Sequence, residues 1–288
     1  MKPGSPEWCR RVSPSKAAAI LGHSPWDSPR AIYHKMRGDV PWDEETEAME
    51  RGNLLESGVL AWWRKRHPEH GEWAEQVTYT LGDWCVATPD AVTTLDGATV
   101  IVEAKTSSDM DEWGDSGTDA VPTHYLTQAY LAAHVANRCG VPVSVVHMPV
   151  LGPRLRFSNY LIPHDPEVGE LLEKRLRAFY ESLSADEPPP LDDTVATYQA
   201  MRKVHPQIDA GQTAELDPAL AGEFVAAALD ADAAEARARL ARSRVLEAVG
   251  RAQWVECGGV RVARRQANAT GVALVRTTRQ TTFEGVPA

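Results

Sequence analysis

Two charged residues interrupt an apolar segment at residues 100–108, which read VIVEAKTSS. Strand alternation places Glu103 and Lys105 on the same face, about 7 Å apart along the strand. Charged side chains are rarely buried without a partner or a function. A tight turn predicted at Asp96–Gly97 brings Asp90, from the preceding strand, across to the same end of the sheet. Two carboxylates and one ammonium are therefore expected to converge there.

This set of groups suits metal-assisted hydrolysis of a phosphodiester. Mg²⁺ takes oxygen ligands and keeps several waters, so Asp90, Glu103 and one main-chain carbonyl form a sufficient set. The metal acidifies a bound water and neutralises charge that grows on the phosphate oxygens. Lys105 would position that water or help to deprotonate it, since the pKa of a buried lysine moves readily. A cross-strand ion pair on a half-exposed sheet explains Glu103 and Lys105 equally well.

Two predicted helices carry further groups that can reach this site. Glu56, in GNLLE, lies late on the helix before the sheet and can supply another carboxylate. Tyr125 and Gln128, in YLTQ, lie one turn apart on the helix that follows, where both can hydrogen-bond a phosphate or a water. The alternatives are a glutamate on a helix surface and a tyrosine at the rim of the core.

The periodicity of apolar residues predicts the elements that position these groups. Helices are expected at about 13–22, 24–38, 45–69, 122–140, 165–185 and 217–251, and β-rich segments at 75–81, 84–92, 99–106, 141–152, 154–162, 254–266 and 271–283. The apolar side of the third helix is expected to include Met49, Leu54, Leu55, Val59, Leu60 and Trp63. This order predicts an α/β (α+β) core with a central mixed sheet flanked by helices, followed by a long C-terminal helix and a short β-hairpin. We expect a domain at 1–205 and an Arg-rich appendage at 206–288.

Charge is unevenly distributed along the 288 residues, whose net charge is −10. From Arg237 to Arg279 there are ten arginines and only two acidic residues, a net of +8, so the remainder carries about −18. Such a basic segment suits a polyanion or an acidic partner, and a solvated helix face explains it as well. No apolar run approaches the roughly 18 residues of a membrane span, so we expect a soluble, cytoplasmic protein.

The four cysteines are far apart and form no CxxC pair, and the nine histidines form no HExxH motif. Scattered thiols are expected, with neither a zinc site nor an iron–sulfur cluster. No GxxxxGK[ST] or GxGxxG motif is present, so no nucleotide cofactor is expected.

Five short motifs in order resemble one known family. The segments GNLLE, TPD, VEAK and YLTQ, together with the opening VSPSKAAAILGHSPWDSP, look like the PD-(D/E)xK nuclease superfamily. Within it they resemble the lambda-exonuclease-like, YqaJ-type viral recombinase family, over roughly residues 8 to 165. The resemblance implies a restriction-endonuclease-like core. It also covers only part of the chain, which leaves the role of the Arg-rich tail open.

The resemblance also implies roles for individual residues. Asp90 and Glu103 would be metal ligands, and the carbonyl of Ala104 would complete the shell. Lys105 would activate the nucleophilic water. The remaining roles are that Glu56 binds the metal directly or through water, that Gln128 orients water or phosphate, and that Ser15, Arg10 or Arg11, and Tyr125 contact DNA.

By the same resemblance the chain would be a Mg²⁺-dependent exonuclease, with Mn²⁺ as a substitute, acting on the ends of linear duplex DNA. Its polarity would be 5′ to 3′, its assembly a trimeric ring, and its partner a single-strand-annealing protein in phage or prophage recombination in a bacterial host. Two alternatives stay open. One is a RecB-like or defence endonuclease, although such nucleases usually carry His where Glu56 stands. The other is a non-catalytic DNA-binding or assembly module that uses the Arg-rich tail.

Overall fold

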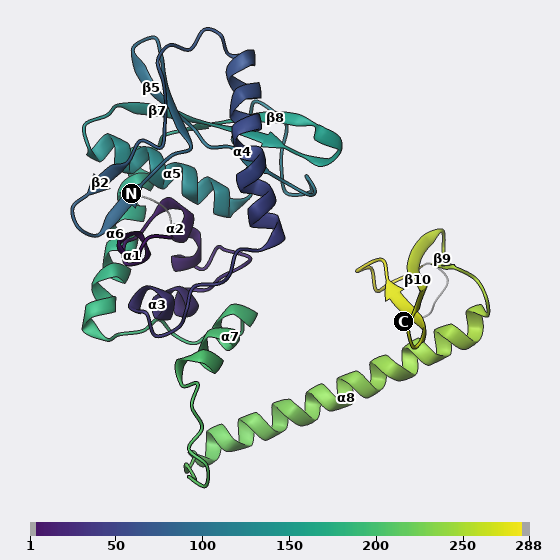
Figure 1. The fold of residues 1–288 in the computed structure, drawn as a ribbon. Coiled ribbons are helices and arrows are strands. Elements are labelled where there is room, and N and C mark those ends of the chain that lie inside the picture. Colours follow the sequence, from purple (N-terminus) through teal and green to yellow (C-terminus); the bar gives the residue numbers. More distant parts are fainter. Residues whose placement is uncertain (1–3, 284–288) are drawn as a thin grey trace. The chain divides into compact units, whose positions relative to one another are not determined.

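The computed structural model describes residues 4–283 (Figure 1). The chain divides after Ile208 into two compact units, called unit 1 and unit 2. The helices of unit 1 are α1 (Pro6–Cys9), α2 (Pro14–Ile20), α3 (Pro29–Arg37), α4 (Glu47–Arg66), α5 (Thr123–Arg138), α6 (Pro166–Ala185) and α7 (Val195–Val204), with a 3₁₀ turn at Pro153–Leu155. Its strands are β1 (Trp73–Glu75), β2 (Tyr79–Leu81), β3 (Cys85–Ala87), β4 (Ala91–Leu95), β5 (Ala98–Val102), β6 (Lys105–Thr106), β7 (Val143–Leu151) and β8 (Phe157–Pro163).

A six-stranded mixed sheet forms the centre of unit 1. Its order is β1-β4-β5-β7-β6, and β8 is a further neighbour of β7. Strands β5 and β6 both pair parallel with β7, β5 with its first half and β6 with its end, whereas β8 pairs antiparallel with it. The β4–β5 hairpin is antiparallel, with Ala91 opposite Val102, whereas β5 and β7 run parallel. Strand β2 pairs antiparallel with β3 in a separate two-stranded sheet. The predicted mixed α/β core is therefore confirmed.

Helices cover the two faces of this sheet, as the alternation of side chains requires (Figure 1). Ile101 of β5 lies in the larger core, with α5 and the inward side chains of β7 and β8. Val102 and Ala104 point the opposite way, into a smaller core with Val59 and Trp63 of α4. Glu103 and Lys105 therefore share the face of Ile101, on the side of α5.

The chain leaves the strand path at Glu103–Ala104, between β5 and β6. The main-chain N–H of Glu103 still donates to His147 of β7, at 2.9 Å. The N–H of Ala104 instead donates to a side chain, described below. The continuous strand predicted over 99–106 is thus divided in two, and the charged pair lies at the interruption.

Helix α4 is less amphipathic than its sequence predicts. Val59, Leu60 and Trp63, in its second half, are buried. Met49, Leu54 and Leu55, in its first half, are exposed, because the sheet covers only the later turns. The first half begins at Thr46, whose hydroxyl accepts a hydrogen bond from the N–H of Met49 and caps the helix.

Two segments differ from the predicted strands for local reasons. The strand predicted at 75–81 is split into β1 and β2 at Gln76, which has a positive φ of 56°. Between the helices predicted at 165–185 and 217–251, where no element is predicted, the chain forms α7. The Thr197 hydroxyl of α7 forms a 2.7 Å hydrogen bond with Ser28, the N-cap of α3, so α7 belongs to unit 1.

Residues 107–122 form a polar segment along the edge strand β8. The N–H of Gly117 donates to the carbonyl of Asn159, and the N–H of Leu161 donates to that of Thr118. The hydroxyl of Tyr160 reaches the carbonyl of Gly114 at 3.0 Å. This loop is thus fastened to β8 by hydrogen bonds.

Unit 2 consists of α8 (Pro218–Val249) and a three-stranded antiparallel sheet, β9 (Trp254–Cys257), β10 (Val260–Asn268) and β11 (Gly271–Arg276). The long helix is as predicted, with Asp217 as its N-cap. The sheet has one strand more than the predicted hairpin. Gly258 and Gly259, with φ of 55° and 78°, make a turn that divides the first predicted strand.

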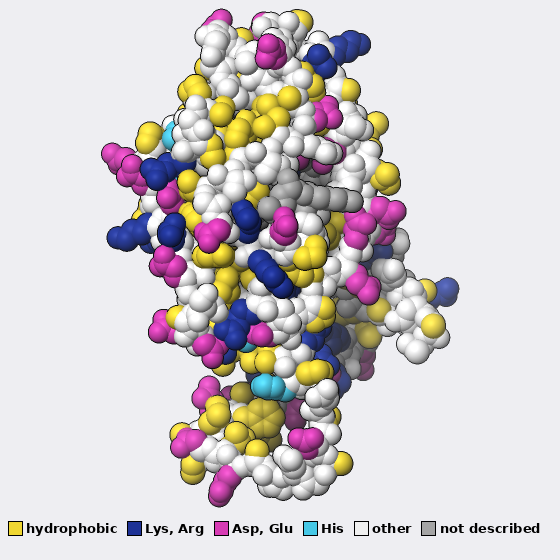
Figure 2. Space-filling model, turned by 60° about the vertical axis from the view of Figure 1, so that its left-hand side comes forward, with side chains coloured by type: hydrophobic (Ala, Val, Ile, Leu, Met, Phe, Trp, Pro, Cys, Tyr) yellow, Lys and Arg dark blue, Asp and Glu magenta, His cyan; other side chains and the backbone are white. Residues whose placement is uncertain are grey.

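The four cysteines have free thiols, as predicted. Across residues 4–283, no helix combines the length and apolar character needed to cross a bilayer. On the face drawn in Figure 2, acidic and basic side chains lie interspersed rather than in separate fields.

Candidate active site

The β4–β5 hairpin places Asp90 beside the point where β5 ends. Oδ2 of Asp90 accepts a hydrogen bond of 2.8 Å from the main-chain N–H of Ala104. Because Ala91 pairs with Val102, the residues just outside that pair, Asp90 and Glu103, lie on facing arms of the hairpin. The side chain thus holds the backbone at the interruption between β5 and β6, as the predicted turn at Asp96–Gly97 allows.

Glu103 is almost completely buried and is held by two donors from different elements. Its Oε2 lies 3.2 Å from Nζ of Lys105 and 3.1 Å from Nε2 of Gln128 on α5. Burial and the nearby negative charge of Asp90 raise the pKa of Glu103 to about 8, although Lys105 opposes this effect. The carboxylate is therefore held where its ionised form is costly, a situation typical of functional sites.

Lys105 provides the positive charge of the cluster. Burial acts to lower its pKa, but the carboxylates of Glu103 and Asp90 outweigh burial, and the net effect is a raised pKa. Its Nζ also lies 5.7 Å from the ring centroid of Tyr125. Lys105 therefore carries a positive charge that interacts with both carboxylates, those of Glu103 and Asp90.

Glu56, on α4, is close enough to the cluster to interact electrostatically with Asp90 and Lys105. Burial raises its pKa, as does the charge of Asp90, while Lys105 lowers it. Burial likewise raises the pKa of Asp90, against the effects of Lys105 and of the Ala104 N–H. The charge of Lys105 thus acts on three carboxylates, those of Glu56, Asp90 and Glu103.

The oxygen donors of the cluster suit a metal ion that keeps part of its water shell. Within residues 4–283, no three His, Cys, Asp or Glu side chains lie close enough together to hold a metal ion by themselves. The carboxylates of Asp90 and Glu103 remain, with main-chain oxygen at Ala104. Such a set of hard oxygen donors fits Mg²⁺, which is commonly bound through one or two carboxylates and retains several waters.

The predicted DNA-contacting residues near the N-terminus lie outside this hydrogen-bonded cluster. Ser15 is exposed, and its hydroxyl pairs with that of Ser13 at 3.0 Å. Arg10 is exposed at the end of α1, and Arg11 donates to the carbonyl of Gly82 at 3.4 Å. In the structure described for residues 4–283, no hydrogen bond links these side chains to the carboxylates.

Lys16 was not singled out by the sequence, yet it fixes this N-terminal segment. Its buried Nζ donates to the carbonyls of Trp8, Cys9 and Arg11 at 2.5, 3.2 and 2.7 Å. It also lies 3.7 Å from the ring centroid of Trp8. Burial lowers the pKa of Lys16 to about 7. A lysine followed directly by the apolar run AAAI in the short helix PSKAAAI is the signal that could have identified it.

Aromatic rings adjoin the lysine end of the cluster. Tyr125 packs against Trp113 and His124, with ring centroids 5.4 and 4.1 Å away. Trp26, which is 68% exposed, meets the His124 ring edge-on at 4.6 Å. The sequence predicts a role for Tyr125 but not its contact with the opening segment that carries Trp26.

A second unpredicted cluster joins three histidines on the side of the sheet covered by α4. The ring centroids of His67, His70 and His147 are 5.4 to 5.8 Å apart, around Trp63. Burial, with the other two histidines, lowers the pKa of His147 to about 4. His147 is far from His67 and His70 in sequence, so only the fold brings it to them.

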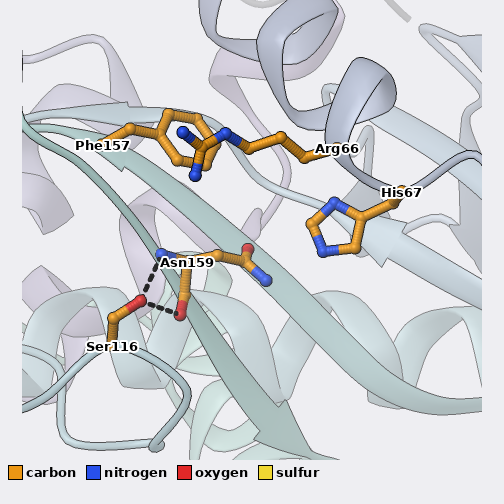
Figure 3. Close-up of a pocket in the computed structure, with 5 residues that line it drawn as sticks. All are labelled: Arg66, His67, Ser116, Phe157 and Asn159. Atoms are coloured by element: carbon orange, nitrogen blue, oxygen red, sulfur yellow. Dashed lines mark hydrogen bonds between the residues drawn. The ribbon is translucent and has the colours of Figure 1, made fainter.

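Figure 3 shows a cavity of about 390 Å³ beside the histidines, lined by Arg66, His67, Ser116, Phe157 and Asn159. The Arg66 guanidinium lies 5.2 Å from the Phe157 ring centroid. The Ser116 hydroxyl is bonded to the main chain of Asn159 (Figure 3). None of the candidate catalytic residues lines this cavity, so it is separate from the carboxylate cluster.

Comparisons with known proteins agree with the family resemblance. Residues 8–139 match the model of the YqaJ-like viral recombinase domain. None of the curated proteins compared with this chain matches it.

Solved structures are similar in shape. An alkaline exonuclease from Laribacter hongkongensis has 16% identity and a TM-score of 0.43, with 62% of this chain and 90% of that chain covered. Its complex with dAMP gives 15% and 0.44, with the same coverage. A phage-related exonuclease from Haemophilus somnus 129PT gives 11% and 0.41, with 61% and 96% covered.

Proposed function

We propose that this chain, whose residues 8–139 carry a YqaJ-like viral recombinase domain, is a metal-dependent exodeoxyribonuclease that acts on the ends of linear duplex DNA. The observation that carries the proposal is the buried Glu103, bonded to both Lys105 and Gln128 and repelled by Asp90. A structural ion pair needs one carboxylate and one ammonium. The additional carboxylates of Asp90 and Glu56 are costly unless a cation joins them.

Asp90, Glu103 and the main-chain carbonyl of Ala104 would hold Mg²⁺, with Mn²⁺ as a substitute, and Glu56 would act through a bound water. The metal supplies an acidified water and neutralises charge on the scissile phosphate. A divalent cation would also stabilise the ionised carboxylates of Asp90 and Glu103, whose pKa values burial raises, and would offset the repulsion that Asp90 exerts on Glu103. This relief is the physical reason that the donor set suits such an ion.

The other side chains would place the substrate. The Lys105 ammonium, on the same face as Glu103, would orient the attacking water and face the phosphate. Gln128 would fix the Glu103 carboxylate through the 3.1 Å hydrogen bond. Tyr125, beside Lys105, would contact the DNA backbone, as would Ser15 and either Arg10 or Arg11 at the terminus. By family resemblance the polarity would be 5′ to 3′ and the setting phage or prophage recombination.

A digestion assay tests the proposal. Purified protein is expected to degrade linear duplex with Mg²⁺, to stop with a chelator, and to spare a closed circle of the same sequence. Glu103→Gln should abolish digestion, whereas Glu170→Gln, the same change on an exposed position of α6, should leave it intact. Cleavage of the circle would favour an endonuclease of the same superfamily. DNA binding without any digestion by the unaltered protein would favour a non-catalytic module.

A further inference from the structure

Helix α8 of unit 2 is 32 residues long and contains no buried residue. Five of its large apolar side chains are more than half exposed, namely Leu220, Phe224, Val225, Leu229 and Leu240. Most helices in proteins are stabilised by packing of an apolar face rather than by helix propensity alone. The apolar side chains of α8 are therefore largely unpacked within the residues that the structure describes.

Apolar residues recur along α8 at alternating spacings of four and three. This seam comprises Leu220, Phe224, Ala227, Ala231, Ala234, Ala238, Ala241, Val245 and Ala248. The average spacing is that of a two-helix coiled coil, in which each seam residue packs against the facing helix. The largest seam residues lie near the N-terminal end and small ones follow.

The charges beside this seam change sign along the helix. Glu223 and Asp230 immediately precede seam residues in the first half, and Arg237 and Arg244 continue the same row, at intervals of seven, in the second. Residues 218–235 carry four acidic and no basic side chains, whereas residues 236–249 carry four arginines and one glutamate. Among the residues that the structure describes, none of the four in this row has an ion-pair partner.

We propose that α8 pairs with α8 of a second copy of this chain, side by side and antiparallel, independently of the proposed nuclease activity. In the matching register, Phe224 faces Ala241 of the second copy and Leu220 faces its Val245, so large residues meet smaller ones. Glu223 then lies beside Arg244 of the second copy. Asp230 lies beside its Arg237, and the twofold symmetry gives four ion pairs.

Charge complementarity selects this arrangement over the parallel one. Charged residues beside the seam set the orientation of coiled-coil helices. In a parallel pair, Asp230 would lie beside Glu235 of the second copy, and Arg237 beside Arg242. Both contacts join like charges, so the parallel pair is disfavoured where the antiparallel pair gains attraction.

Charge reversal in the full-length protein tests the proposal by sedimentation equilibrium. The variant Glu223→Arg/Asp230→Arg turns all four attractions into repulsions and should weaken self-association about fiftyfold. The variant Arg237→Glu/Arg244→Glu should do the same. A mixture of the two variants restores every pair between unlike copies and should associate as well as the unaltered protein. Combining all four changes in one chain should also restore it.

A matched control carries the same change of charge away from the seam. Asp232→Arg/Glu247→Arg should leave self-association intact, and circular dichroism should show that every variant keeps its helix content. A parallel pair is indicated if Glu223→Arg/Asp230→Arg strengthens association. The proposal is overturned by that result, by an unaltered protein that does not associate, or by a mixture that fails to recover. Association equal in all variants would place the contact on another surface.

Discussion

Lys105 and Glu103 form an ion pair of 3.2 Å in unit 1, and Arg239 and Glu235 form one of 2.9 Å in unit 2. The side chains of the first pair are 14% and 3% exposed, and those of the second are 60% and 67% exposed. The shorter pair lies in water, which screens it and lets both side chains move. The longer pair is largely shielded from water.

The difference shows that burial, rather than distance, determines what a pair can do. In unit 1, Asp90 and burial shift the pKa of Glu103, and the site holds more negative charge than one lysine can balance. In α8 the charged side chains are exposed to solvent, and their positions along the helix determine which charges a partner helix would meet. Chemistry on a substrate is therefore expected from the first pair, and recognition of a partner from the second region.

Removing the buried ammonium should have the largest effect. Lys105→Met is expected to lower the rate of DNA digestion about a thousandfold, since it removes a group that orients the water and faces the phosphate. The protein should stay folded, because Glu103 can take up a proton once its cation is lost. Digestion rates and thermal unfolding measured on the same preparation check both parts. A variant with more than a tenth of the activity would contradict the role of Lys105.

Acid should destabilise unit 1 through His147. Burial and the neighbouring His70 and His67 lower its pKa from 6.5 to about 4, so below pH 6.5 the unfolded chain binds the proton more tightly. Stability is therefore unaffected above pH 6.5 and falls as the pH drops towards 4, by on the order of 3 kcal/mol. His147→Phe keeps an aromatic ring and should flatten this dependence in urea unfolding. An unchanged acid slope in that variant would exclude His147 as its source.

Much of unit 1 could be predicted because its signals are local. The alternation of Ile101, Glu103 and Lys105 and the turn at Asp96–Gly97 depend only on neighbouring residues, and both occur in the structure. The mixed α/β fold and the family resemblance are confirmed. The catalytic roles assigned to the cluster remain predictions.

Other features depend on contacts that no local pattern encodes. Periodicity cannot tell that the sheet covers only the second half of α4, so the exposure of Leu54 was missed. The three histidines meet only because β7 lies beside α4. Lys16 reaches three carbonyls through the folding of the N-terminal segment back onto α2.

Replacing Gln128 should lower the rate of DNA digestion moderately, because its hydrogen bond to the site is to Glu103. Gln128→Leu removes the 3.1 Å hydrogen bond to Oε2 and should lower the digestion rate about thirtyfold. A donor to an ionised carboxylate lowers the pKa of that carboxyl group, so the variant's activity should also need a higher pH. The pH–rate profile separates this role from a merely structural one, which would leave the profile in place.

Breaking the exposed ion pair between Glu235 and Arg239 on α8 should have the smallest effect, and that effect is on stability. A double-mutant cycle with Glu235→Ala and Arg239→Ala is expected to give a coupling energy of about 0.3 to 0.5 kcal/mol, typical of residues four apart on a helix. The same cycle in high salt should give less, since ions screen exposed charges. A coupling above about 2 kcal/mol would mean that the pair is buried in the assembled protein. Because Arg239 lies away from the seam, such a value would place the partner of α8 on a different face from the one proposed.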